Sequence, residues 1–241
     1  RVEAAGTFDA ADVSPLTSFE LGGRGRVRVS IGGVFDAPRV GGHMDMTGFS
    51  FDGIEVGDIR GDWALVHDYM AVSLPQLEAT KGASRYVVHD LLFDFREHIE
   101  VTGRLHSGML RLADAYDAFG YSEDERYTPY QATARGSAGI RFTHGFPSDG
   151  PNGTFDTNFE FELLEADFAG FNFEHGSLGG HYRWYDLTRG MDSAVLDLDH
   201  MVLHKGSGTV NVSGRIDRAN LMLSVMADKG PVWERIMARH G

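Results

Sequence analysis

The side chains in this sequence that could do chemistry are histidines and carboxylates, and their spacing does not match a metal site. His200 and His204 are four residues apart, which would place two ligands on one face of a helix. They flank Met201-Val202-Leu203, a segment typical of a β-strand, in which positions four apart lie more than ~13 Å apart along the backbone. No third ligand with a suitable spacing stands nearby. The sequence therefore predicts surface or turn histidines and no metal site.

The acidic and serine-containing motifs are also incomplete. Asp197 and Asp199, with Asp192 upstream, lack the central glycine, the spacing and the terminal glutamate of a calcium loop. His175-Gly176-Ser177-Leu178-Gly179 lacks the first glycine of a nucleophile elbow, so we expect a turn there. Lys205-Gly206-Ser207-Gly208 is too short for a phosphate-binding loop and is typical of a hairpin turn. We predict no catalytic residue, no cofactor and no enzymatic activity.

Composition excludes several classes of partner. A formal net charge of −13 argues against nucleic acid and against flat adsorption on anionic lipid. The chain has 31 Gly and only 7 Pro, and a glycine share well above the usual ~7% favours tight hairpin turns and bulges. Cysteine is absent, which excludes disulfides and thiolate chemistry. No apolar run approaches the ~18 residues of a membrane helix, and the chain begins at Arg1 without a signal region, so we expect an excised or processed segment whose membrane anchor, if any, lies elsewhere.

The elements that must position these residues are strands with one apolar and one charged face. Val27, Val29 and Ile31 alternate with arginine and serine, and the same period of two recurs along the chain. The parity of the pattern changes after Thr47-Gly48, which predicts a bulge or tight turn at Gly48. Strands of this kind belong to antiparallel sheets that are covered on one side. Loops are expected at Leu74–Ser84, Ser122–Pro129 and Pro147–Gly153.

Two segments have helical spacing, and each follows a strand that contains Gly-Arg. Gly108–Gly120 carries apolar residues three and four apart, and Lys229–Gly241 has Pro231 placed for a first helical turn. The chain is therefore interpreted as two repeated units, residues 1–121 and 122–241, each ending in a short amphipathic helix.

The apolar strand positions are the remaining candidate site. They predict either an ordinary core closed by a second sheet and the helices, or a face that stays open as a trough for an apolar ligand. The residues expected to line such a trough are Val27, Val29, Ile31, Met44, Met46, Phe49, Phe51, Trp63, Phe142, Phe159, Phe161, Phe171, Phe173, Tyr182, Trp184, Leu203, Val210 and Val212.

Strand-and-glycine patterns and a short helix with an acidic linker recur along the chain. They lie in Gly32–Gly42, Phe49–Gly61, Leu110–Gly120, Glu123–Tyr127, Lys205–Val210 and Ser213–Asp217. These segments resemble repeats of the translocation and assembly module TamB (AsmA-like) family, and the resemblance covers roughly residues 20–240. The resemblance implies a middle segment of a longer protein in the periplasm of a Gram-negative bacterium. A part of that protein outside this chain would anchor it to the inner membrane. Such proteins form a long β-taco whose apolar lumen carries phospholipid tails toward the outer membrane.

The sequence and this resemblance together predict an all-β, elongated, twisted antiparallel sheet that forms an open groove with two short helices. The expected function is a non-enzymatic conduit for phospholipid acyl chains that supports outer-membrane biogenesis. Expected partners are those acyl chains, flanking segments of the same protein and an outer-membrane barrel, without nucleic acid. The alternative is a closed β-barrel or sandwich that binds one small apolar ligand or serves as a structural or interaction domain.

Overall fold

The computed structural model of the 241-residue chain describes residues 2–12, 20–51, 53–125, 128–144, 153–168, 170–186, 193–217 and, for the backbone, 221–227. Most of the described chain forms strands of one antiparallel sheet, which confirms the predicted all-β class. The elements are β1 (Val2–Asp9), η1 (Ala10–Asp12), β2 (Leu21–Val34), β3 (Ala37–Phe51), β4 (Ile54–Val66), β5 (Ala71–Lys81), β6 (Ser84–Asp94), β7 (Ile99–Arg111), α1 (Leu112–Ala118), β8 (Tyr130–His144), β9 (Thr154–Phe168), β10 (Phe171–Phe173), β11 (His175–Trp184), β12 (Ala194–Lys205), β13 (Gly208–Asp217) and β14 (Leu221–Ala227).

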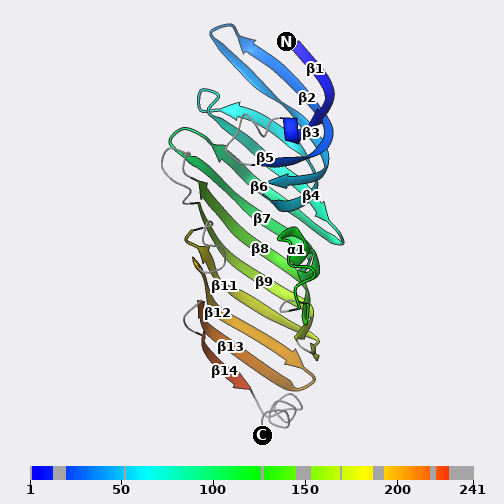
Figure 1. Ribbon diagram of the computed structural model, residues 1–241, viewed down its shortest axis with the longest axis vertical. Coiled ribbons are helices and arrows are strands. Elements are labelled where there is room, and N and C mark those ends of the chain that lie inside the picture. The colour runs from blue at the N-terminus through cyan, green and yellow to red at the C-terminus, as the bar shows by residue number, and fades with distance from the viewer. Residues whose placement is uncertain are drawn as a thin grey trace.

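The strands follow one another through the sheet in chain order. Each strand pairs with its neighbours in the path from β1 to β14, and short β10 pairs with β9 beside that path (Figure 1). Among the described residues, β1 and β14 lie at opposite ends of the path and are not paired with each other. The sheet is therefore open and not a closed barrel.

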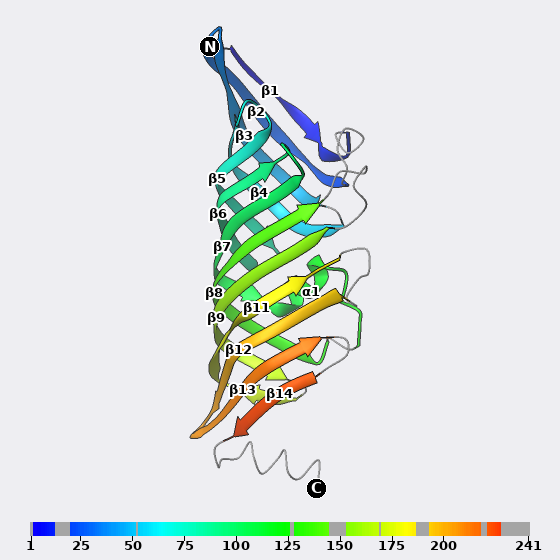
Figure 2. The same cartoon turned by 90° about the vertical axis from the view of Figure 1, so that its left-hand side faces the viewer.

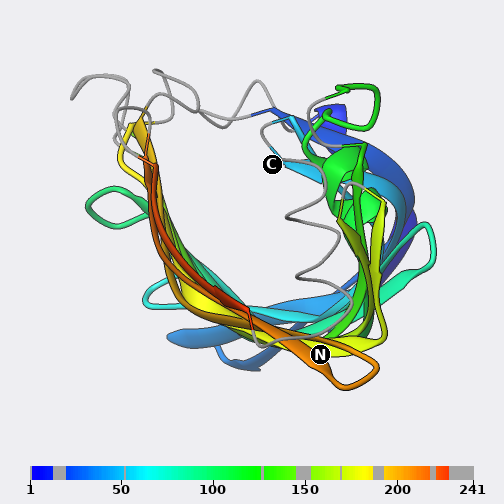
Figure 3. The same cartoon turned by 90° about the horizontal axis from the view of Figure 1, so that it is seen from below.

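The sheet is elongated and strongly curved. Figure 2 shows the strands running obliquely across the long axis of the molecule. Viewed along that axis, the ribbon of the sheet has the outline of a U (Figure 3). The predicted elongated, twisted sheet agrees with this arrangement.

A bulge lies where the parity of the sequence pattern changes. Met46 pairs with Ile59 and Phe49 pairs with Gly57, so β3 has an extra residue between these two pairs. Gly48 lies inside the bulge with φ of 62°, a conformation that glycine adopts without strain. The predicted irregularity at Gly48 is confirmed.

The loop expected at Leu74–Ser84 is wrong, because this segment forms most of β5. Pro75 has no amide hydrogen, and it lies where the register of β4 against β5 shifts between Gly61 and Ala64. On the other side it lies opposite Asp90 of β6, which has φ of 52°. The irregularity removes the need for an amide donor, so proline is tolerated inside a strand.

The helix expected over Gly108–Gly120 is shorter than predicted. Gly108–Arg111 continues β7, and α1 begins at Leu112. The second expected helix, Lys229–Gly241, lies outside the described residues. The two predicted units, residues 1–121 and 122–241, share one sheet because β7 of the first pairs with β8 of the second.

Helix α1 is attached to the β5–β6 hairpin by one carboxylate. Asp114 Oδ2 accepts hydrogen bonds from the amides of Ala83 (3.0 Å) and Ser84 (2.9 Å) and from the Ser84 hydroxyl (2.7 Å). The Ser84 hydroxyl oxygen in turn accepts from the amide of Arg111 at 2.9 Å. Lys81 adds ion pairs to Asp117 and to Glu55 of β4. These contacts hold α1 on the side of the sheet where β5 and β7 end and where β4, β6 and β8 begin.

Candidate functional site

One face of the sheet is apolar along its whole described length. Register pairs link one residue of each successive strand into a row that crosses from β1 to β14, and the row contains only glycine and apolar residues. We call the face that carries it the inner face. The row is Gly6, Val27, Met44, Gly61, Leu77, Val88, Leu105, Ala138, Phe159, Gly180, Leu198, Gly214 and Leu223.

A neighbouring row on the same face has the same character with two exceptions. Tyr86 and Ser107 are its only polar members. The full row is Phe8, Gly25, Met46, Ile59, Ala79, Tyr86, Ser107, Gly136, Phe161, Leu178, Met201, Val212 and Val225.

The two polar side chains of this row form hydrogen bonds with the protein itself. The Tyr86 hydroxyl donates to the carbonyl oxygen of Val56, and burial raises the pKa of Tyr86 to about 12. The Ser107 hydroxyl donates to the carbonyl oxygen of Arg85 at 2.7 Å. Neither group therefore presents a free donor to an apolar ligand on the inner face.

The opposite face is charged, and its charges pair across strands. Arg60 of β4 donates to Glu78 of β5 with Nε–Oε2 of 2.7 Å, and Arg135 of β8 donates to Glu162 of β9 at 2.7 Å. Arg141 of β8 reaches Glu100 of β7 at 2.7 Å. Because side chains alternate between faces along a strand, these ladders and the inner rows lie on opposite sides of the sheet.

The inner face is the concave one, because residues of distant strands meet on it. The ring of Phe51 in β3 lies 5.6 Å from that of Phe142 in β8 and 5.9 Å from that of Phe93 in β6, between ring centroids. Strands five apart in a flat sheet would be separated by roughly 24 Å. The sheet must therefore bend around these side chains, as Figure 3 shows for its overall course.

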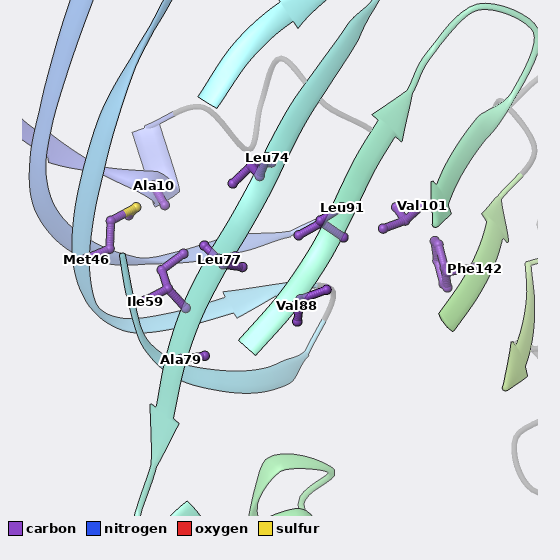
Figure 4. Close-up of a cluster of buried hydrophobic side chains, with 10 residues drawn as sticks. All are labelled: Ala10, Met46, Ile59, Leu74, Leu77, Ala79, Val88, Leu91, Val101 and Phe142. Carbon is purple, nitrogen blue, oxygen red and sulfur yellow. The ribbon is translucent and has the colours of Figure 1, made fainter. Parts of the chain in front are cut away.

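The first part of the inner face forms a packed cluster. Ala10 of η1 joins buried side chains from β3 to β8, among them Met46 and Ile59 (Figure 4). A second cluster is centred on Leu163, which is 2% exposed, and extends from β8 to β13. Its aromatic members include Phe168 and Phe173, whose ring centroids are 6.2 Å apart.

Glycines on the inner face lie beneath large side chains of the next strand. A Cβ at Gly136 would lie 2.7 Å from the Phe161 ring, and one at Gly180 would lie 3.1 Å from the ring of Phe159. A Cβ at Gly42 would lie 3.1 Å from the Trp63 indole nitrogen. The glycine content thus serves packing within strands as well as the hairpin turns expected from composition.

The structure places all eighteen predicted lining residues on the inner face. Seventeen of them are half-buried or buried, among them Phe51, Phe171 and Phe173 of its two clusters. Ile31 is the one exposed member, at 44%. Their contact with a lipid stays a prediction.

Sequence reasoning missed the inner-face residues of β5, β6 and β7. Leu74, Leu77, Val88, Leu91 and Val101 are all buried in the first cluster. Leu74 and Leu77 are three residues apart, which in a regular strand would place them on opposite faces. The irregularity at Pro75 turns both side chains inward, so the two-residue pattern did not reveal them. Two leucines at an odd spacing on either side of a proline could have indicated a strand with an irregularity at this point.

Most of the residues with possible chemistry are dispersed over the outer face, whereas His144 is stacked with Phe142 on the inner face and its Nδ1 is buried without a hydrogen-bond partner. His200 lies 3.3 Å from Glu160, and His43 lies 2.8 Å from Asp62. Within the described ranges, no group of three or more His, Asp or Glu is placed to hold a metal ion. The turn expected at His175–Gly179 is wrong, because β11 begins at His175.

The densest of these polar groups is an ion-pair cluster around Asp156. Its carboxylate accepts from Arg183 Nε at 2.8 Å and lies 2.8 Å from His181 Nε2. Partial burial raises the pKa of Asp156, but the hydrogen bonds from Arg183 and His181 outweigh it and hold the pKa below its ordinary value. The cluster contains no nucleophile beside a base, so it is interpreted as a cross-strand ion pair.

Comparisons with protein families, with curated proteins and with solved structures found no match. The resemblance to the TamB family therefore stays a prediction. No helix in the described part of the chain is long and apolar enough to span a membrane.

Proposed function

We propose that the protein is a non-enzymatic conduit segment whose concave face forms a groove for phospholipid acyl chains. The observation that carries the proposal is the inner row from Gly6 to Leu223, which crosses the whole open sheet without a polar residue. Along this row an apolar ligand would meet only glycine and apolar residues, from one strand to the next. The groove corresponds to the β-taco that the family resemblance implies.

The energetics of such a face suit transport more than selective binding. Burial of apolar surface contributes about 25 cal/mol per Å², without preferred direction. Affinity would be distributed over many side chains, while the headgroup would remain outside the groove. A ligand held in this way can move along the face, because each new contact replaces an equivalent one.

The part of the groove near β9 to β13 is the best candidate for an acyl chain. Near β3 to β8 the rings of Phe51 and Phe142 already pack against each other on the concave side, which leaves less apolar surface there for a ligand. Near β12 and β13, Leu196 is half-buried and its partner Ile216 is 37% exposed. Exposed aliphatic side chains of this kind on a concave face would gain most from a lipid tail.

The proposal includes the cellular setting implied by the resemblance. The segment would act in the periplasm of a Gram-negative bacterium, between flanking segments of the same longer protein and an outer-membrane barrel partner. Among the described strands, the unpaired edge of β14 is compatible with a following segment. The alternative of a closed barrel or sandwich is contradicted by the single open sheet, whereas a purely structural or interaction role predicts no bound lipid.

The experiment compares two double variants that add the same charge to opposite faces. Leu196→Glu with Ile216→Glu places two carboxylates on the inner face, and Asn211→Glu with Ser213→Glu places two on the outer face of β13. We expect the parent, purified from a Gram-negative host, to carry phospholipids of the host's composition in native mass spectrometry. The inner-face variant should lose at least about 90% of this lipid, and the outer-face variant should retain it.

Circular dichroism and melting curves separate loss of lipid from loss of fold. These positions are preferable to Phe51 and Phe173, because Phe173 is 8% exposed and a charge there would disrupt the cluster. A folded inner-face variant that keeps its phospholipid would contradict the assignment of the groove. A parent without any lipid would favour the structural role.

A further inference from the structure

Two neighbouring hairpin turns expose large apolar side chains at one end of the molecule. In the β2–β3 turn, Val34 is 69% and Phe35 is 99% exposed. In the β4–β5 turn, Tyr69 is 45% and Met70 is 47% exposed. Together with Ile31 at the end of the inner face of β2, these five residues are called the hairpin-tip patch.

The two turns are joined by a hydrogen bond and by an unusual backbone. The Tyr69 hydroxyl donates to the carbonyl oxygen of Pro38, which lies opposite Gly33 in the β2–β3 hairpin. His67, Asp68 and Tyr69 have φ values of 51°, 55° and 69°, a left-handed run that is rare for residues other than glycine. The surrounding structure must therefore hold the β4–β5 turn in this shape, which keeps the Tyr69 side chain beside Pro38 of the β2–β3 hairpin.

The patch continues the inner face to the end of the long axis. Figures 1 and 2 both show the turn between β2 and β3 at the upper extremity of the molecule. Along β2, Val27 and Val29 are half-buried on the inner face, and Ile31 beyond them is exposed. An apolar path thus leads from the concave face to Phe35.

The size of the patch favours a membrane over a protein partner. One fully exposed phenylalanine and four partly exposed side chains present on the order of 500 Å². This area is larger than scattered surface residues produce, but it is smaller than the ~800 Å² that each partner buries in a stable protein interface. Hairpin tips that enter a bilayer need no complementary surface, because the acyl chains adapt to them.

The charges around the patch favour a zwitterionic surface. Its described neighbours include the carboxylates of Asp36 and Asp68 and the guanidinium of Arg39, all exposed. The whole chain has a net charge of −13, which repels anionic headgroups. Tyrosine is suited to the boundary, since its ring is apolar and its hydroxyl can face the headgroups.

We propose that the hairpin-tip patch inserts into the surface of a bilayer with zwitterionic headgroups, so that the end of the inner face meets the acyl chains. The inference rests on the proposed function and names the source from which the groove takes its lipid. Phe35 is the residue that enters deepest, because it is at the tip and fully exposed.

The test is flotation of the full chain with phosphatidylcholine vesicles at physiological salt. We expect Phe35→Ser with Met70→Ser to lower the vesicle partition coefficient by at least about tenfold. Phe119→Ser is the control, since Phe119 is also 45% exposed but lies after α1 at the opposite ends of the strands. Replacing a third of the lipid by phosphatidylglycerol should weaken binding of the parent severalfold.

Each result either supports or overturns the proposal. Equal flotation of the parent and the tip variant, an equal loss in Phe119→Ser, or a parent that never floats would overturn it. So would a dimer of the parent that dissociates in the tip variant without any flotation, because the occupant would then be a second copy. Co-purified lipid is measured on the same samples. A parent that carries lipid but does not float contradicts only the proposed insertion into the bilayer. A parent that floats but carries no lipid contradicts only the proposed lipid groove.

Discussion

At the scale of single residues, the inner face is built from pairs of glycine and large apolar side chains. Gly42 of β3 lies opposite Trp63, and Gly136 of β8 lies opposite Phe161. A Cβ at either glycine would lie even closer to a backbone carbonyl oxygen of a neighbouring strand than to the ring, so the missing side chain leaves room for both. Glycine destabilises an ordinary strand, and it is retained here where a neighbouring ring takes the space.

A methyl group at such a glycine should destabilise the sheet. A Cβ on Gly42 would lie 1.8 Å from the carbonyl oxygen of Arg28, so Gly42→Ala forces the backbone of β2 and β3 apart. We expect a loss of about 1–3 kcal/mol in the free energy of unfolding, measured by urea denaturation. Gly6→Ala is the matched control, because nothing lies within 4 Å of its Cβ, and it should change stability by less than ~0.5 kcal/mol. Equal effects of the two changes would show that the close approach of β2 and β3 at Gly42 is not the cause.

At the scale of elements, the fold consists of hairpins with one helix in the described chain fixed to a hairpin edge. The β5–β6 turn has no side-chain acceptor of its own for the amides of Ala83 and Ser84, and Asp114 of α1 supplies it from thirty residues away. The helix has no fully buried residue, so this polar attachment carries more of its position than apolar packing does.

Removal of that carboxylate should release α1. Asp114→Ala leaves two backbone amides and the Ser84 hydroxyl without their acceptor, which costs roughly 1–3 kcal/mol. Hydrogen exchange of the Ala83 and Ser84 amides should accelerate at least about tenfold, while amides in β12 and β13 keep their rates. Glu123→Ala, at an exposed position after the helix, should alter neither quantity. Unchanged exchange at Ala83 in Asp114→Ala would mean that other contacts hold the helix.

At the scale of the whole molecule, the sequential path of strands leaves the sheet open. Each strand pairs with the strands that precede and follow it along the path. The sheet curves enough to bring Phe51 of β3 against Phe142 of β8, but the edge strands β1 and β14 are not paired with each other. Thirteen strands along one path extend roughly 55–60 Å in the pairing direction. A compact domain of this chain length would be shorter, with a diameter of about 46 Å.

Small-angle scattering should record this shape in solution. A compact 241-residue domain has a radius of gyration of about 18 Å. We expect a clearly larger value and a pair-distance distribution with a long tail toward large distances. A symmetric distribution with a radius near 18 Å would contradict the extended open sheet.

The alternation of side chains was readable from the sequence, since it depends only on the two-residue period of a strand. Val27, Met44 and Phe159 were assigned to one face for this reason, and the irregularity at Gly48 followed from the change of parity. The same rule did not predict the strand around Pro75. A proline is accommodated there because the pairing of β5 with β4 and β6 is irregular, and that irregularity depends on the neighbouring strands.

By itself the sequence determined the antiparallel strands, their apolar face and the absence of a recognisable catalytic motif, because these depend on residues close together in the chain. Only the tertiary structure decided that the sheet curves and remains open, that α1 is fixed through Asp114, and that Phe35 and Tyr69 meet at one end. These properties depend on contacts between strands whose separation along the chain no local period encodes.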